Sequence, residues 1–164
     1  RDMQDRNVRM VEEDAFKVGV DLATTPGRVV FRNRLLELIH YAPTTEQVHK
    51  TPLLIVTPWI NKYYILDLTA KKSLVRWLTA QGFSVFITSW KNPTADMSET
   101  RFDDYLLEGV DETIRFVCKL CKVPQVALTA YCIGGTLAST YMAWANRRYG
   151  PDKVPVGCWT LCTT

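Results

Sequence analysis

Residues 125–137 read Q-V-A-L-T-A-Y-C-I-G-G-T-L, and this stretch decides the fold. A short apolar run breaks at Tyr131-Cys132-Ile133, meets two glycines and is followed by a helical pattern. The pattern predicts a strand, a sharp turn and a helix, with Cys132 in the turn. Small residues on either side of such a turn let the strand and the helix approach each other closely.

This layout is typical of the nucleophile elbow of the α/β-hydrolase fold, in which one small residue stands two positions before the nucleophile and another two positions after it. Here the five residues are Ala130-Tyr131-Cys132-Ile133-Gly134, so Cys132 stands at the nucleophile position. Ala130 departs from the usual glycine. Because a methyl group is the least intrusive replacement, we expect the elbow to be kept but slightly crowded. The alternative is that Cys132 is a small buried hydrophobic residue, the commonest fate of a free cysteine.

The composition is that of a globular protein. The 164 residues suffice for one ordinary domain or part of a larger one, and 47% are hydrophobic while 23% are charged. The net charge of +3 is spread along the chain, which disfavours a nucleic-acid partner. Five cysteines and the lack of a signal sequence disfavour export and favour a cytoplasmic location. No apolar run approaches the ~20 residues of a membrane span, so we expect no transmembrane segment.

Strands and helices are expected to alternate along the chain. We expect residues 1–25 to form a polar lead-in and linker. Residues 26–164 are expected to form a partial α/β-hydrolase domain, a mainly parallel sheet with helices on both faces and the C-terminal part missing. The first predicted elements are a hairpin at 29–31 and 35–41, a strand at 52–56 and an aromatic loop at 59–68. A helix at 73–82, a strand at 83–88, a polar loop at 92–101 and a helix at 102–121 follow. The last elements are the elbow strand with its helix to 149–151 and a strand at 156–161.

Cys132 has the surroundings that an acyl-transfer nucleophile needs. It would lie at the start of a helix beginning near Gly134, whose dipole favours a thiolate. Attack on a thioester or ester would place an oxyanion near the Ile133 N–H, with a second amide from the loop Trp59-Ile60-Asn61. A cysteine sulfur suits an acyl group taken from a thioester, because the exchange is nearly isoenergetic.

The chain lacks an obvious general base. His40 and His49 both precede Cys132, whereas this fold places its acid and then its histidine after the nucleophile. His40 is expected on the surface of the hairpin edge. His49 could lie near the site, but this is the less favoured position. Asp152, the only carboxylate after Cys132, sits in a turn and is expected to cap or be solvated. The chain is therefore expected to be a fragment of a longer enzyme, or not an enzyme.

The other cysteines are expected to pack rather than react. Cys118 and Cys121 form a lone C-x-x-C in an apolar helix, without a second ligand pair at zinc spacing. Cys158 and Cys162 fall in or near the last strand and are interpreted as packing residues. No spacing of ligands predicts a metal or a bound cofactor.

Four segments together resemble the polyhydroxyalkanoate synthases, which polymerise (R)-3-hydroxyacyl-CoA into storage polyester. The segments cover nearly the whole chain and read T-P-G-R-V-V-F-R-N, T-P-L-L-I-V-T-P-W-I-N-K-Y-Y-I-L-D-L, F-I-T-S-W-K-N-P and A-Y-C-I-G-G-T-L. The variants W-I-N-K-Y-Y and C-I-G-G look more like the short-chain, class I synthases. The family usually has glycine in place of Ala130 and Pro-Pro in place of Thr57-Pro58.

The resemblance implies that Cys132 carries the growing chain as a thioester and that Ile133, Ile60 and Asn61 supply the oxyanion environment. It places the general-base histidine and its aspartate beyond Thr164, so that the chain by itself would be inactive. It implies (R)-3-hydroxyacyl-CoA, the growing polyester and the polymer granule surface as partners, with a possible homodimer. CoA enters as part of the substrate and no separate cofactor is expected. The alternatives are a cysteine hydrolase of esters or lactones and a truncated, non-catalytic binding domain.

Overall fold

The computed structural model describes residues 15–162 of the chain, and its centre is a sheet of six strands. The strands lie in the order β1-β2-β6-β3-β7-β8, with β1, β2 and β6 antiparallel and β6, β3, β7 and β8 parallel. Their bounds are Arg28–Arg32 (β1), Leu36–Tyr41 (β2), Leu53–Val56 (β3), Val85–Trp90 (β6), Val126–Tyr131 (β7) and Val156–Cys162 (β8). This is the mainly parallel sheet of the α/β-hydrolase fold, as predicted.

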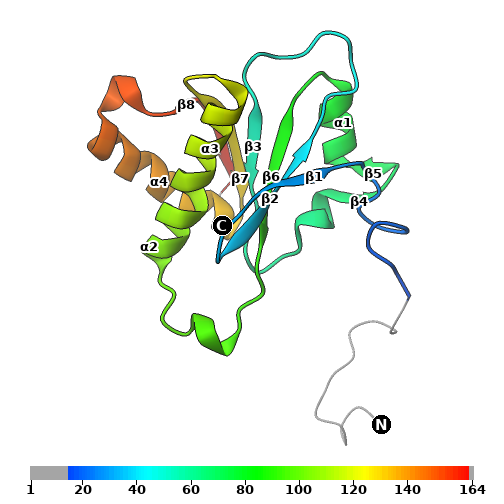
Figure 1. The fold of residues 1–164 in the computed structure, drawn as a ribbon, viewed down its shortest axis with the longest axis horizontal. Helices are drawn as coiled ribbons and strands as arrows, with labels where there is room; N and C mark the ends of the chain where they lie inside the picture. The colour runs from blue at the N-terminus through cyan, green and yellow to red at the C-terminus, as the bar shows by residue number, and fades with distance from the viewer. Residues whose placement is uncertain (1–14, 163–164) are drawn as a thin grey trace, which may run out of the picture.

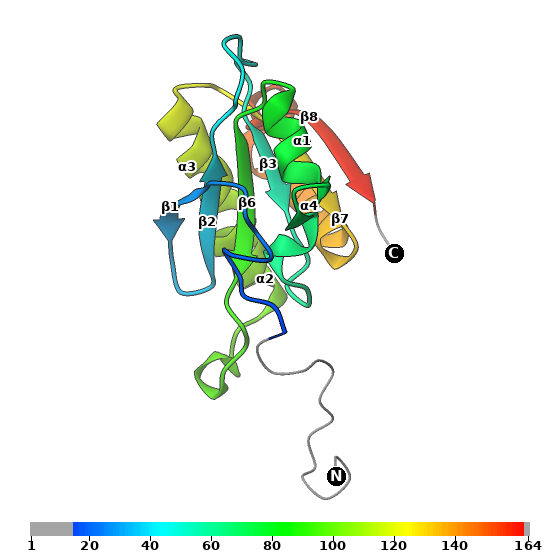
Figure 2. The same cartoon turned by 90° about the vertical axis from the view of Figure 1, so that its right-hand side faces the viewer.

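Helices cover both faces of the sheet, as Figures 1 and 2 show. On one face lie α2 (Phe102–Asp104), a π-helical turn (Tyr105–Asp111), α3 (Glu112–Cys121) and α4 (Ile133–Tyr149), and on the other lies α1 (Leu74–Ala80). Short 3₁₀ turns occur at Tyr63–Leu66, Ala95–Met97 and Pro151–Lys153. No helix in this part of the chain has the length and apolar character of a membrane span.

The alternation of side chains along β3 divides the core in two. Leu54 and Val56 face the larger cluster under α3 and α4, whereas Leu53 and Ile55 face a smaller cluster under α1. All four side chains are buried, which is why this strand reads as a continuous apolar run. The strand predicted at 52–56 is therefore confirmed as the covered centre of the sheet.

The helix predicted over 102–121 is present but is not a regular α-helix. Its middle, Tyr105–Asp111, is wound as a π-helix between α2 and α3. Leu106, Val110, Ile114 and Val117 of the predicted apolar stripe are buried, so the change of winding keeps that face on the sheet. An apolar spacing of three or four residues does not distinguish the two kinds of helix, and the sequence therefore did not reveal the π-helical turn.

A small hairpin was not predicted. Strands β4 (Asp67–Thr69) and β5 (Lys72–Ser73) pair just before α1, at the end of the region expected to be an aromatic loop. The nearly inaccessible Asp67 carboxylate accepts hydrogen bonds from the hydroxyls of Ser73 and Thr25, both at 2.6 Å. Thr25 lies in the predicted lead-in, of which residues 1–14 lie outside the described part of the chain. Hydrophobic periodicity could not find this hairpin because polar groups hold it together.

Two side chains do not lie where the sequence placed them. The prediction of a surface position for His40 is wrong, because β2 is an inner strand between β1 and β6. The His40 ring is half-buried, stacks on Phe86 with ring centroids 4.4 Å apart and has its Nε2 2.8 Å from the Ser84 hydroxyl. Conversely, Cys158 was expected to pack but is exposed, because β8 is the last strand of the described sheet and nothing there covers it.

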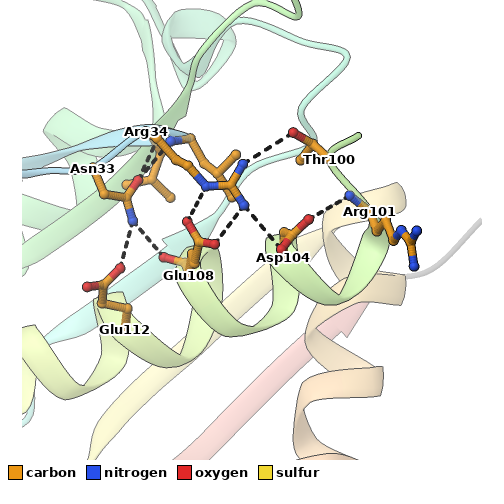
Figure 3. Close-up of polar contacts among 9 residues, drawn as sticks. Asn33, Arg34, Thr100, Arg101, Asp104, Glu108 and Glu112 are labelled. Atoms are coloured by element: carbon orange, nitrogen blue, oxygen red, sulfur yellow. Dashed lines mark hydrogen bonds and ion pairs between the residues drawn. The ribbon is translucent and has the colours of Figure 1, made fainter. Parts of the chain in front are cut away.

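A polar network joins the β1–β2 turn to the helices (Figure 3). The Arg34 guanidinium donates to both carboxylate oxygens of Glu108, at 2.7 and 2.6 Å, and lies 3.1 Å from an oxygen of Asp104. The Asn33 side-chain amide donates to the Glu108 carbonyl at 2.9 Å and to the Glu112 carboxylate at 2.8 Å. The hairpin therefore holds the backbone of the π-helical turn at Glu108.

Candidate active site

The strand, turn and helix predicted around Cys132 are present. β7 ends at Tyr131, α4 begins at Ile133, and Cys132 between them has φ 55° and ψ −138°. A positive φ is costly for a residue with a Cβ and persists only where the surrounding structure imposes it. This strained conformation at the strand-to-helix junction is the geometry of a nucleophile elbow. Ala130 is buried just before it, and the elbow is kept despite its methyl group.

Gly134 brings the start of α4 against the end of β3. A Cβ added at Gly134 would lie 2.7 Å from the Val56 carbonyl oxygen and 3.1 Å from that of Thr57. Because β3 and β7 are parallel neighbours with Val56 opposite Ala130, the loop after β3 adjoins Cys132 at the carboxyl edge of the sheet. The loop predicted to carry oxyanion donors therefore lies at the same edge of the sheet as the elbow.

The predicted oxyanion residues differ in whether their backbone N–H groups already donate a hydrogen bond. Gly135 and Thr136 donate to the Cys132 carbonyl at 2.8 and 3.2 Å, so the helical hydrogen bonds begin there. Ile133 precedes them in the first turn, where N–H groups have no partner within the helix. In the β3 loop, the Asn61 N–H donates to the Pro58 carbonyl at 3.3 Å, whereas Ile60 has an exposed side chain. The Asn61 amide therefore already has an acceptor within the loop.

Thr57, at the start of that loop, is fixed by β6. Its N–H donates to the Thr88 hydroxyl at 2.9 Å, and its own hydroxyl donates to the Thr88 carbonyl at 2.7 Å. The indole N–H of Trp90 donates to the Thr57 carbonyl at 2.6 Å. Sequence reasoning missed both partners, although they lie in the segment F-I-T-S-W-K-N-P, because no local pattern shows that β6 lies beside β3.

Aromatic side chains gather beside this loop. Trp59 contacts Trp90, Phe102 and Tyr105, with ring centroids 6.4, 6.2 and 4.8 Å apart, and Trp90 contacts Tyr105 at 5.2 Å. Gly109 of the π-helical turn packs on the Trp90 ring, since an added Cβ would lie 2.5 Å from its Cη2 atom. The loop after β3 is therefore held from β6 and from the π-helical turn.

The histidines lie away from Cys132. His49 precedes β3, and its N–H donates to the Gly82 carbonyl, which places it at the amino edge of the parallel strands. The less favoured position near the site is thus excluded for His49. His40 is opposite Phe86, near the amino end of β6. Asp152 is exposed in a 3₁₀ turn, in keeping with a solvated role.

Cys118 and Cys121 are half-buried and have the character of packing residues. Cys162, also expected to pack, ends β8 opposite Tyr131, and its side chain lies outside the described part of the structure. Burial raises the pKa of Cys118 to about 11, with a smaller effect from Cys121, and burial likewise raises the pKa of Cys121. Burial, and to a lesser extent the charge of Cys132, raises the pKa of Tyr131 to about 12. Within residues 15–162, His, Cys, Asp and Glu side chains form no cluster of three or more that could hold a metal ion.

The sequence has well-matched relatives. A family model described as the N-terminus of poly-beta-hydroxybutyrate polymerase (PhaC) matches residues 1–78. A poly(3-hydroxyalkanoate) polymerase from Methylorubrum extorquens is 48% identical over 145 residues, which are 86% of this chain and 24% of the relative. The PhaC subunit from Cupriavidus necator is 39% identical over 163 residues, 99% of this chain and 27% of the relative. The chain belongs to the poly(3-hydroxyalkanoate) polymerase family.

This chain spans about a quarter of the length of these curated members of the polymerase family. Among solved structures, an epoxide hydrolase from Vigna radiata matches 85% of the chain with a TM-score of 0.53 and 12% identity, over 38% of its own length. Epoxide hydrolase A from Mycobacterium thermoresistibile matches 82% with a TM-score of 0.51 and 11% identity, over 37% of its length. These likenesses show the α/β-hydrolase fold of the polymerase segment.

Proposed function

We propose that this chain forms the nucleophile-bearing part of a polymerase that joins (R)-3-hydroxyacyl groups from CoA thioesters, with Cys132 as the covalent nucleophile. The observation that carries the proposal is the backbone of Cys132, which has a positive φ between β7 and α4. Strained backbone conformations outside the ordinary regions cluster at active sites, and a nucleophile elbow is one of them. The names of the relatives supply the reaction class.

The proposed step is an acyl transfer. The Cys132 sulfur attacks the thioester carbonyl carbon, and the negative charge on the carbonyl oxygen is stabilised by the N–H groups of Ile133 and of the Ile60–Asn61 loop. The bond to the CoA sulfur then breaks, CoA leaves as the thiol, and the acyl group remains on Cys132. The hydroxyl of a second hydroxyacyl group attacks this thioester, forms an ester bond and frees the cysteine.

The Cys132 thiol must lose its proton before the attack. His40 and His49 both lie toward the amino end of the parallel strands, so neither serves as the base in this proposal. The proposal takes the base and its aspartate from the three-quarters of the family's length that this chain does not span. The same proposal includes membership of the class I-like synthases and a cytoplasmic location on polymer granules.

The test uses the full-length gene product that carries this chain, incubated with (R)-3-hydroxybutyryl-CoA. We expect CoA release, polymer formation, and a mass increase of one or more hydroxybutyryl groups on the peptide that contains Cys132. Cys132→Ala should abolish all three. Cys158→Ala, which removes an exposed thiol on β8, is the matched control and should retain them.

The outcomes separate the alternatives. Release of free 3-hydroxybutyrate without polymer would replace the polymerase proposal by a cysteine hydrolase. Acylation of another cysteine, or full activity in Cys132→Ala, would remove Cys132 from its role. Binding of polymer without any CoA release would favour a non-catalytic domain.

A further inference from the structure

We propose that Trp90 is a positioning residue for the proposed acyl transfer: its indole orients the loop Pro58–Asn61 so that the Trp59–Ile60 backbone faces the acyl group on Cys132. This inference rests on the proposed function for its chemistry. Its structural part rests on the hydrogen bonds made by the N–H and the carbonyl of Thr57 and on the packing of the Trp90 ring.

A hydrogen bond joins the Trp90 indole to the start of the loop, at Thr57. Trp90 is the last residue of β6, and its Nε1 donates to the Thr57 carbonyl oxygen at 2.6 Å. The N–H of Thr57 is held from the same strand by the Thr88 hydroxyl at 2.9 Å. With both polar groups of Thr57 bonded to β6, the direction in which the chain enters Pro58 is fixed.

The Thr57 carbonyl also lies against the elbow helix. The Thr57 carbonyl that accepts from Trp90 also packs against Gly134, where an added Cβ would lie 3.1 Å from its oxygen. One carbonyl therefore touches both the indole and the first turn of α4. A rotation of this peptide would move the loop after β3 relative to Cys132, and a misplacement of about 1 Å at a reacting centre can cost about a hundredfold in rate.

The Trp90 ring is itself packed between the loop after β3 and the π-helical turn. Trp90 meets the edge of Trp59, which is in the loop, and is backed by Gly109 of the π-helical turn. The Glu108 carbonyl, one residue before Gly109, is tied to Asn33 in the hairpin (Figure 3). Trp90 also lines a hollow of about 240 Å³ with Asn33 and Leu36.

Two variants of the full-length gene product test the role. Trp90→Phe keeps an aromatic ring but removes the indole N–H. Gly109→Ala keeps the indole but adds a methyl group that would displace the ring. Trp77→Phe, on the exposed face of α1, is the matched control. The first readout is the single-turnover rate at which (R)-3-hydroxybutyryl-CoA acylates Cys132. The second is the rate at which iodoacetamide alkylates Cys132, because alkylation forms no oxyanion.

We expect Trp90→Phe and Gly109→Ala to slow acylation by about tenfold to a hundredfold. This decrease in rate is no larger than the decrease caused by removing one oxyanion donor. Alkylation should change less than twofold, and Trp77→Phe should match the parent in both assays. Acylation at the parent rate in Trp90→Phe, or equal losses of acylation and alkylation, would overturn the inference. The second result would mean that Trp90 supports the elbow itself rather than the loop.

Amide hydrogen exchange tests the structural part without any chemistry. In Trp90→Phe, exchange should accelerate in peptides covering residues 57–61 and stay unchanged in those covering 133–140. Unchanged exchange at 57–61 would refute the positioning role. If the parent protein is not acylated at all, the proposed function fails, whereas the exchange result still decides whether Trp90 holds the loop.

Discussion

Thr57 donates its backbone N–H to the hydroxyl of Thr88 at 2.9 Å, deep in the sheet, where neither side chain is accessible to solvent. The family resemblance gives proline at the position of Thr57, and proline has no N–H to satisfy. In this chain the threonine at 57 creates a buried donor, and Thr88 on the neighbouring strand accepts from it. The two residues therefore act as a pair.

Thr88→Val should lower the free energy of unfolding by about 1–3 kcal/mol, because the buried Thr57 N–H loses its acceptor. The same substitution made in a Thr57→Pro background should cost much less, because no donor remains. A double-mutant cycle by urea denaturation measures the coupling. Thr140→Val on the exposed side of α4 is the control and should stay within about 0.5 kcal/mol of the parent. Additive effects in the cycle would contradict the pairing.

Gly134→Ala should damage the elbow. The added Cβ would lie 2.7 Å from the Val56 carbonyl oxygen, a backbone atom that cannot rotate away, so α4 or β3 must shift. We expect a loss of about 1–3 kcal/mol in stability from overpacking, and at least a tenfold slower acylation of Cys132. Denaturation and single-turnover acylation measure the two effects. Thr140→Ala, further along the same helix, should leave both at parent values, and a fully active Gly134→Ala would show that the contact does not matter.

Acidification should destabilise the fold through His40. Burial lowers the pKa of this imidazole below its ordinary value of 6.5, so the unfolded chain takes up the proton more readily than the folded one. The contribution of His40 to stability is therefore full above about pH 6.5 and is lost as the pH falls through the lower pKa of the folded state. Its cross-strand neighbour is Arg28, and its Nε2 contacts the Ser84 hydroxyl.

Thermal melts between pH 7.5 and pH 5 measure this effect. The melting temperature of the parent should fall on acidification, and it should fall less in His40→Gln, which keeps a group able to bond Ser84 but does not titrate. His49→Gln is the matched control and should follow the parent. A steeper fall in His40→Gln than in the parent would contradict the assignment.

Asp111 joins the π-helical turn to α4. Its buried carboxylate accepts from Arg115 Nε at 2.8 Å, from the Tyr149 hydroxyl at 2.7 Å and from the Tyr141 hydroxyl at 3.3 Å. Asp111→Asn should lower the free energy of unfolding by about 1–3 kcal/mol, because an amide offers only one oxygen to these donors. Denaturant titration measures it. Asp152→Asn, in an exposed turn, should change stability by less than about 0.5 kcal/mol, and equal effects at the two sites would refute the structural role of Asp111.

Local sequence was sufficient for the main strands and helices, but not for the β4–β5 hairpin or the π-helical turn. The β1–β2 hairpin, the buried strand β3, helix α1 and the elbow strand all lie where patterns of apolar and turn residues predicted them. β6 begins and ends two residues later than predicted, at Val85–Trp90 instead of 83–88, because apolar character alone does not mark the last paired residues. Cys132 was identified as the elbow residue because its small neighbouring residues and the break between strand and helix are visible in the sequence.

The sequence by itself therefore determined the order and type of the main strands and helices, the position of Cys132 in a sharp turn, and the α/β-hydrolase fold. Only the tertiary structure decided that His40 is half-buried and that His49 lies at the opposite edge of the sheet from Cys132. It also decided that Thr88 bonds the N–H of Thr57 and that Trp90 bonds its carbonyl. Strands β3 and β6 are about thirty residues apart in the chain but adjacent in the sheet. Pairing between such distant segments depends on side-chain and hydrogen-bond fit in three dimensions, which periodicity along one segment does not record.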